Sequence, residues 1–154
     1  MISGEKTILL ALEDKSFLKK AVNEENCPAA DTEPFFSKKA RVFAVELRET
    51  GEKVGVIALS VDEKNRSGRF DIAVLPDMRG KGVGTDASAA FLRFAFAEYG
   101  LNRIYASHSV KNSAAGFVLR KTGMSYEGMS RERFYNASGY HDTHNYAILK
   151  REVV

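Results

Sequence analysis

The sequence predicts one α+β domain over residues 1–154, in which a mixed, mostly antiparallel sheet carries helices on both faces. Two observations support this fold class. The first is the order of the segments: a strand, one or two helices, three strands, a helix, a strand, a helix and final strands. The second is the length of 154 residues, 44% of them apolar, which suits one domain with its own core.

The N-terminal part has a clear secondary-structure pattern at its start and none further along. Residues 7–12 form a short apolar run that predicts a strand. Asp14 is a suitable N-cap for a helix to about Asn23, because the apolar residues that follow it recur with helical spacing. Residues 23–40 contain two prolines among mixed charges, which predicts a loop or one broken helix.

Three antiparallel strands are predicted in the middle of the chain. Residues 42–48 and 53–61 are rich in β-forming residues, and the intervening Glu49-Thr50-Gly51-Glu52 is a hairpin signal. A second turn over residues 62–68 leads into the strand expected at residues 69–75.

The C-terminal half predicts two helices and further strands. A helix over residues 86–99 is apolar almost all round, so it should be a central buried element that ends at Gly100. The remaining elements are a strand at 103–110, a helix at 112–121 and strands at 124–128, 131–135 and 143–151.

Residues 70–85, FDIAVLPDMRGKGVGT, predict a strand, a bend and a glycine-rich helix start. Glycine lets backbone N–H groups approach a ligand, and the unpaired N–H groups of a helix N-terminus attract anions, so this stretch is a candidate phosphate site. No hydroxyl residue follows Lys81, which excludes a nucleoside-triphosphate loop. A dinucleotide loop fits poorly, because these glycines lie in mid-chain rather than after the first strand.

The run Arg79-Gly80-Lys81-Gly82-Val83-Gly84 resembles the pyrophosphate loop of the GCN5-related N-acetyltransferases, the GNAT family. Residues 112–124 resemble that family's N-x-x-S/A and V-L-x-K-x-G-F segments. Residues 127–146 resemble the tail of its RimJ/RimL-like branch, which acetylates ribosomal-protein N-termini. The resemblance spans roughly residues 42–150. It implies the GNAT fold, with a central sheet of six to seven strands splayed between strands 4 and 5.

The resemblance also implies acetyl-coenzyme A as the cofactor, held where the strands part near Val74 and Ser107. In the family, loop N–H groups bind the pyrophosphate and a strand N–H polarises the thioester carbonyl, and here that N–H would belong to Val74 or Leu75. Asn112 would bind the pantetheine arm as well as cap a helix. Arg79 and Lys81 would add charge, or would be solvated loop cations. The cofactor-binding residues expected are Val74, Leu75, Arg79, Gly80, Lys81, Gly82, Val83, Gly84, Thr85 and Asn112.

Transfer to an amine needs a proton acceptor, because only the neutral amine attacks a thioester. Asp71 is the first candidate base, since it lies near where several family members keep a glutamate and would share a strand face with Ala73 and Leu75. Glu132 and His108 are further catalytic candidates. The alternatives are a strand-end charge for Asp71, an exposed strand charge for Glu132 and a structural role for His108.

The sequence departs from the family at the usual general acid. Ala115 stands where the RimJ/RimL-like branch usually carries a serine, and Leu119 stands where other members have a tyrosine. Two functions therefore compete. The first is transfer of acetyl from acetyl-coenzyme A to a primary amine, of a small molecule or a protein N-terminus, by direct attack. The second is an acyl-coenzyme A-binding module that transfers nothing.

Several other partners are not expected. The net charge of +3 is scattered, so no nucleic-acid partner is predicted, and no apolar run is long enough to cross a membrane. His141 and His144 lack further ligands at metal spacing, so no metal is predicted. The lack of an export signal and the single Cys27 favour a cytoplasmic location. A homodimer and the identity of the acceptor amine are left open.

Overall fold

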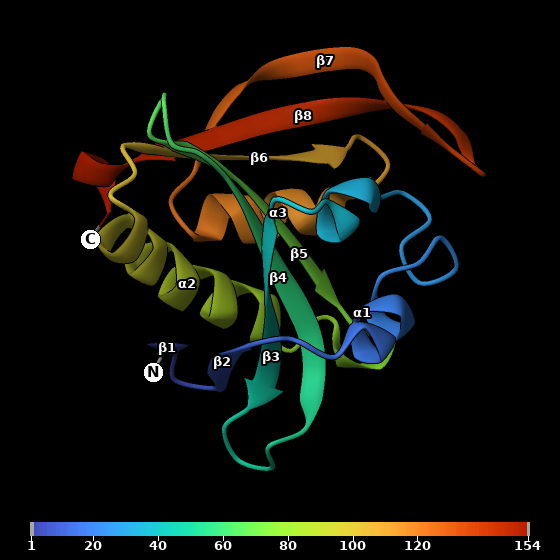
Figure 1. The fold of residues 1–154 in the computed structure, drawn as a ribbon. Helices are drawn as coiled ribbons and strands as arrows, with labels where there is room; N and C mark the ends of the chain where they lie inside the picture. The colour runs from blue at the N-terminus through green and yellow to red at the C-terminus, as the bar shows by residue number, and fades with distance from the viewer. Residues whose placement is uncertain (1, 154) are drawn as a thin grey trace.

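A computed structural model describes residues 2–153 and confirms the α+β class (Figure 1). The sheet has eight strands in the order β1-β2-β3-β4-β5-β6-β8-β7. The strands are β1 (Ile2–Ser3), β2 (Thr7–Ala11), β3 (Ala40–Leu47), β4 (Lys53–Asp62), β5 (Ser67–Val74), β6 (Arg103–Ser109), β7 (Ser125–Asn136) and β8 (Gly139–Leu149). The helices are α1 (Lys15–Ala21), α2 (Val83–Tyr99) and α3 (Ser113–Lys121), with short 3-10 turns η1 (Glu33–Phe36), η2 (Pro76–Met78) and η3 (Lys150–Glu152).

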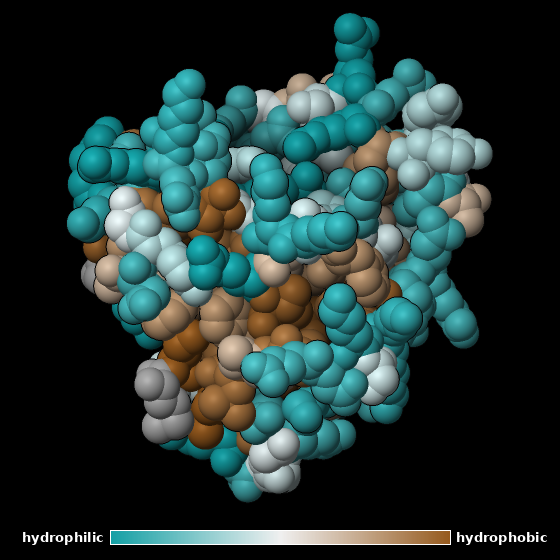
Figure 2. Space-filling view, in the orientation of Figure 1, coloured by the Kyte–Doolittle hydropathy of each residue, from teal (hydrophilic) through white to brown (hydrophobic). Residues whose placement is uncertain are grey.

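Each face of the sheet carries its own apolar cluster. On one face, α2 packs its buried side chains, among them Phe91 and Ala95, against Phe43 and Phe70 of the strands. On the other face, α1 and the segment after it pack against β4 and β5. Figure 2 shows that hydrophilic side chains dominate the surface in this view, and that apolar ones gather in its lower half over α2 and β1–β3.

Strands β5 and β6 part soon after they meet. They run parallel and pair at three positions only, Ser67–Arg69 with Arg103–Tyr105. Beyond these pairs β5 leaves β6, and the two diverge toward their C-terminal ends (Figure 1). The splay expected between the fourth and fifth strands is therefore present, if the count starts at β2.

The sheet has eight strands instead of the expected six to seven, and two of its strands differ from the predicted elements. The two-residue strand β1 pairs with β2 and lies outside every predicted element. The strands predicted at 124–128 and 131–135 are one strand, β7, because its ladder with β8 continues across two register shifts. One of these bulges lies between Ser130 and Phe134 and holds Glu132 at a positive φ of 47°.

Helix α2 begins at Val83, three residues before the start predicted at Asp86. Gly82 adopts a left-handed conformation (φ 79°) at the N-cap, so the glycines of the loop lead directly into the helix. Asp86 lies in the first turn. Residues 23–40 contain no α-helix and are organised around η1, whose Phe35 is buried. Within residues 2–153 no helix has the length and apolar character needed to cross a membrane.

Asp86 fastens the β1–β2 turn to α2. Its carboxylate accepts hydrogen bonds from the N–H groups of Glu5 (2.9 Å) and Lys6 (3.0 Å) and from the Thr7 hydroxyl (2.7 Å). Burial alone raises the pKa of Asp86, but these hydrogen bonds outweigh burial and hold the pKa below its ordinary value. The ionised carboxylate is therefore the form that stabilises the turn.

We expect Asp86→Ala to lower the free energy of unfolding by about 1–3 kcal/mol at neutral pH, because three donors lose their acceptor. The contribution of Asp86 to the free energy of unfolding should be complete above the ordinary pKa of 3.8. It should vanish as the pH falls through the lowered pKa. Urea unfolding at neutral and at strongly acid pH measures both effects. Asp77→Ala, which removes an exposed acid, is the control, and an equal loss at both pH values would contradict the prediction.

Candidate active site

The loop before α2 has the geometry of an anion cradle. Gly80 and Gly82 both have left-handed φ values, 77° and 79°. The first bond that returns from the helix to the loop runs from the N–H of Asp86 to the Gly82 carbonyl (3.1 Å). The N–H groups of Val83, Gly84 and Thr85 therefore lie in the first turn without intrahelical acceptors, which is the arrangement that binds phosphate in other proteins.

Two basic side chains bind backbone carbonyls around this loop. The Arg79 guanidinium donates to the carbonyls of Val74 (3.0 Å) and Asn26 (2.7 Å), so it ties the segment after α1 to the end of β5. Lys6 was not anticipated, yet its ammonium reaches the Lys81 carbonyl (3.3 Å) beside Gly82. Lys6 comes from the β1–β2 turn, and no local sequence signal connects that turn with the loop.

The end of β5 distinguishes the two N–H groups considered for the thioester carbonyl. The N–H of Leu75 donates to the Val54 carbonyl (2.8 Å) and extends the β4–β5 ladder. Because successive N–H groups of a strand point to opposite sides, the N–H of Val74 points away from β4 and toward the opening beside β6. Val74 therefore has the free donor, and Leu75 does not.

A cavity lies where β5 and β6 part, and it joins three elements. Ile72 and Asp71 line it from β5, Ser107 and His108 from β6, and the start of α3 closes one side. The full lining is Ala29, Ala30, Asp31, Phe35, Arg69, Phe70, Asp71, Ile72, Ala106, Ser107, His108, Ser109, Asn112, Ala115, Leu119 and Phe134. Asn112 caps α3 by accepting from the N–H of Ala115 (3.2 Å), so the amide nitrogen of its side chain can still donate to a ligand.

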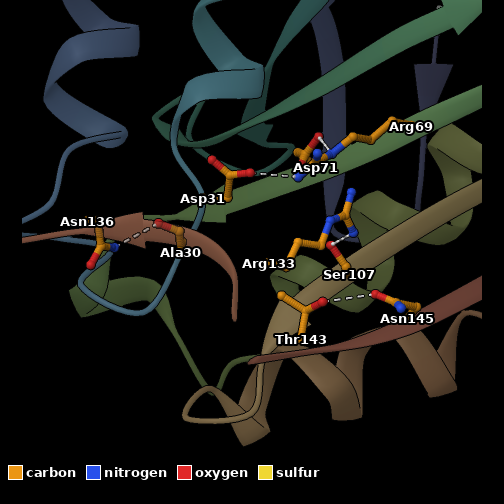
Figure 3. Close-up of polar contacts among 9 residues, drawn as sticks. All are labelled: Ala30, Asp31, Arg69, Asp71, Ser107, Arg133, Asn136, Thr143 and Asn145. Atoms are coloured by element: carbon orange, nitrogen blue, oxygen red, sulfur yellow. Dashed lines mark hydrogen bonds and ion pairs between the residues drawn. The ribbon is translucent and has the colours of Figure 1, made fainter. Parts of the chain in front are cut away.

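Asp71 is held by an arginine that it shares with a second carboxylate. Arg69 donates to Asp71 (3.1 Å) and to Asp31 (3.3 Å), which lies on the segment between α1 and η1 (Figure 3). Arg69 and Asp71 are two residues apart on one strand, so their side chains lie on the same face of the sheet. This alternation in the sequence could have indicated Arg69 as a partner of Asp71. Asp31 lies in the segment without a pattern, where nothing indicated its role.

The protonation of Asp71 is governed by burial. Burial raises the pKa of Asp71 to about 6, and Arg69 opposes this rise by favouring the carboxylate. Asp31 adds to the rise by like-charge repulsion, whereas Arg133 opposes it. A carboxylate with a pKa near 6 is mostly ionised at neutral pH, and it is a stronger proton acceptor than an exposed aspartate.

The other two catalytic candidates lie in different surroundings. His108 lines the cavity, but its ring is buried and stacked on Tyr146. Its Nδ1 lies 2.7 Å from the Ser109 carbonyl, and burial lowers the pKa of His108, so the neutral ring is favoured. Glu132 is exposed and lies outside the cavity lining, and its N–H donates to Asp142 (2.7 Å). The bulge breaks the alternation, so Glu132 does not share the surroundings of Phe134.

The tip of the β7–β8 hairpin fastens the wall of the cavity that carries Asp31. The Asn136 side chain donates to the carbonyl of Ala30 (3.3 Å), as Figure 3 shows, and to the carbonyl of Pro28 (3.1 Å). The buried His141 supports this tip through Ser109, Ser138 and Asn136. Segments more than 100 residues apart thus set the position of Asp31 opposite Arg69.

Comparisons with known proteins establish the class. The model of the acetyltransferase (GNAT) domain matches residues 11–125, more than half of the chain. The chain therefore belongs to the GNAT acetyltransferase family, and the predicted GNAT fold is confirmed.

Individual relatives differ in what they act on. The chain is 32% identical over 103 residues to the "Putative ribosomal N-acetyltransferase YdaF" of Bacillus subtilis, covering 66% of this chain and 56% of the relative. It is 28% identical over 113 residues to spermidine N(1)-acetyltransferase of Escherichia coli K12, covering 73% and 60%. The match thus spans less than two thirds of either relative. The spermidine N-acetyltransferase of Vibrio cholerae, solved with CoA and spermine, shares the fold, with a TM-score of 0.82, 23% identity and coverage of 96% and 98%.

We expect Gly80→Ala to weaken binding of coenzyme A by at least about tenfold, a change of about 1.4 kcal/mol, because the loop N–H groups would shift. Gly51→Ala is a matched control: its φ of 74° is close to the 77° of Gly80, and an added Cβ meets nothing within 4 Å at either site. Both variants should lose a similar stability, about 1–2 kcal/mol. Calorimetric titration with coenzyme A separates the two, and equal affinities would contradict the assignment of the loop.

Proposed function

We propose that this protein transfers the acetyl group of acetyl-coenzyme A to a primary amine by direct attack. The observation that carries the proposal is the parting of β5 and β6, which leaves a cavity lined by Asp71 and Asn112, while Val74 and the glycine loop follow at the C-terminal end of β5. Family membership supports the same cofactor. The loop suits a diphosphate, because its left-handed glycines leave the first N–H groups of α2 accessible.

The residues of the cleft divide the reaction between them. Acetyl-coenzyme A supplies a thioester whose carbonyl carbon accepts the amine. The N–H of Val74 stabilises the carbonyl oxygen as it gains negative charge, an effect worth about 3 kcal/mol in comparable sites. Asp71 accepts the proton that the amine nitrogen must lose. The carbon–sulfur bond then breaks, and the leaving thiolate takes a proton from water.

The missing general acid does not remove this activity. Ala115 and Leu119 line the cavity, and neither can donate a proton. A thiolate is a good leaving group that can depart unprotonated, so turnover continues without an acid. A module that binds acyl-coenzyme A without transfer remains the competing function, and the motivation for it is the same pair of residues.

The proposal extends to the acceptor amine, the location in the cell and the oligomeric state. The curated relatives support two acceptor classes, a ribosomal protein and a polyamine. The RimJ/RimL-like assignment rests on the tail motif together with the first of these.

A cytoplasmic location is proposed because the cofactor and both acceptor classes occur there. A homodimer is supported by β7, an edge strand that exposes Tyr126, Met129 and Tyr135.

Free thiol should appear when the protein, acetyl-coenzyme A and a panel of primary amines are mixed. Each transfer releases one coenzyme A thiol, which a chromogenic disulfide reagent detects. The Gly80→Ala variant at low cofactor concentration should be slower than Gly51→Ala. Tight cofactor binding with thiol release only at the rate without protein would favour the competing module and reject the transferase.

Asp71→Asn should lower the rate at neutral pH by about 10²–10⁴-fold, the usual contribution of a positioned base. The base works only when ionised, so the wild-type rate should rise as the pH increases through about 6, and the rate of the variant should not show this rise. Asp31→Asn is the matched control. This variant keeps Asp71 but removes the second carboxylate that shares Arg69, so the rise of the rate with pH should move to lower pH. An unchanged profile in Asp71→Asn would exclude Asp71.

A further inference from the structure

The face of the sheet that receives the acceptor carries two acids and two arginines: Asp31, Arg69, Asp71 and Arg133 (Figure 3). Asp71 shares its strand face with Ala73, which packs under α1, whereas Phe70 packs toward α2 on the opposite face. Arg69 forms ion pairs with both carboxylates of this face. Both acids therefore have a countercharge before any acceptor enters.

Arg133 has different surroundings from Arg69. Its guanidinium donates to the hydroxyl of Ser107 (3.3 Å), and Ser107 lines the cavity. In Figure 3 the guanidinium extends from β7 toward the Arg69–Asp71 pair. Among the residues described, the ion pairs on this face involve Arg69, and the polar partner of Arg133 is a neutral hydroxyl. Arg133 is exposed, lies outside the cavity lining and acts on Asp71 through space, so it brings to the cavity edge a positive charge that forms no ion pair among the residues described.

The backbone of β7 is distorted at the point where it presents Arg133. The bulge between Ser130 and Phe134 holds Glu132, a non-glycine residue, at a φ of 47°. Such a conformation is strained in a non-glycine residue and persists only where the surroundings hold it. Here the Asp142 carboxylate accepts the N–H of Glu132 (2.7 Å). Bulges re-aim side chains, and this one contains Arg133 and precedes Phe134, which lines the cavity.

We infer that the acceptor is a primary amine that carries a carboxylate a few bonds away, as in a free amino acid, and that Arg133 binds this carboxylate. The inference rests on the proposed transferase function. The acceptor amine lies at Asp71, and the planar guanidinium of Arg133 suits a carboxylate in a two-pronged hydrogen bond. A polyamine is disfavoured, because its further ammonium groups would meet Arg133 and would find both acids already paired with Arg69.

Amino acids of increasing chain length, each paired with its own carboxamide, test this inference in the thiol-release assay, with spermidine as the polycation. Rates are compared at equal concentrations of free amine, because the carboxamide lowers the amine pKa. For the best pair, kcat/KM for the carboxylate should exceed that for the amide by at least about tenfold. Arg133→Gln should reduce this ratio toward one through the KM of the carboxylate, and Arg133→Lys should give an intermediate ratio.

Arg131→Gln is the control, because it removes an exposed arginine on the other side of the same bulge and should keep the wild-type ratio. Calorimetric titration of the same acceptors into the coenzyme A complex should show the same preference without turnover. Equal efficiency within every pair, a preference for spermidine, or a ratio unchanged in Arg133→Gln would overturn the inference and leave the transferase function standing. Absence of thiol release with every amine would overturn both.

Discussion

The early separation of β5 and β6 is the constraint on which the rest of the site depends. The two strands pair at three positions and then diverge, so the C-terminal half of β5 has a free side where a continuous sheet would have another strand. That free side presents the N–H of Val74. The gap also admits side chains from both faces of the sheet, so the start of α3 and the segment after α1 meet in one cavity.

The separation is stable because other contacts replace the missing ladder. Phe70 and Ile104, on the two parting strands, pack in the apolar cluster under α2. Strand β6 is held on its other side by seven pairs with β8. The carbonyl of Val74 is bound by Arg79, which also reaches the segment after α1. The N–H of Val74 lies on the side of β5 that no strand covers, so a ligand in the opening would be its partner.

Charge in the cleft is arranged so that one carboxylate remains basic. Two acids compete for Arg69, and burial works against ionisation of Asp71, so its pKa lies near 6 in spite of the ion pair. A single acid facing the same arginine would be more acidic and a weaker base. The hairpin tip that fastens residues 28–30 therefore contributes indirectly to the raised pKa of Asp71, because it keeps Asp31 beside Arg69.

The sequence by itself determined the α+β class, the order of the elements, the glycine loop at a helix N-terminus, the cap at Asn112 and the face of β5 that carries Asp71. These features follow from local propensity and periodicity, which act over a few residues. Only the tertiary structure decided that Asp31 shares Arg69 across 38 residues, that Lys6 reaches the loop, that Val54 occupies the N–H of Leu75 and that a bulge separates Glu132 from the cavity. Those outcomes depend on strand register and on contacts between distant segments, and neither is encoded in any local pattern.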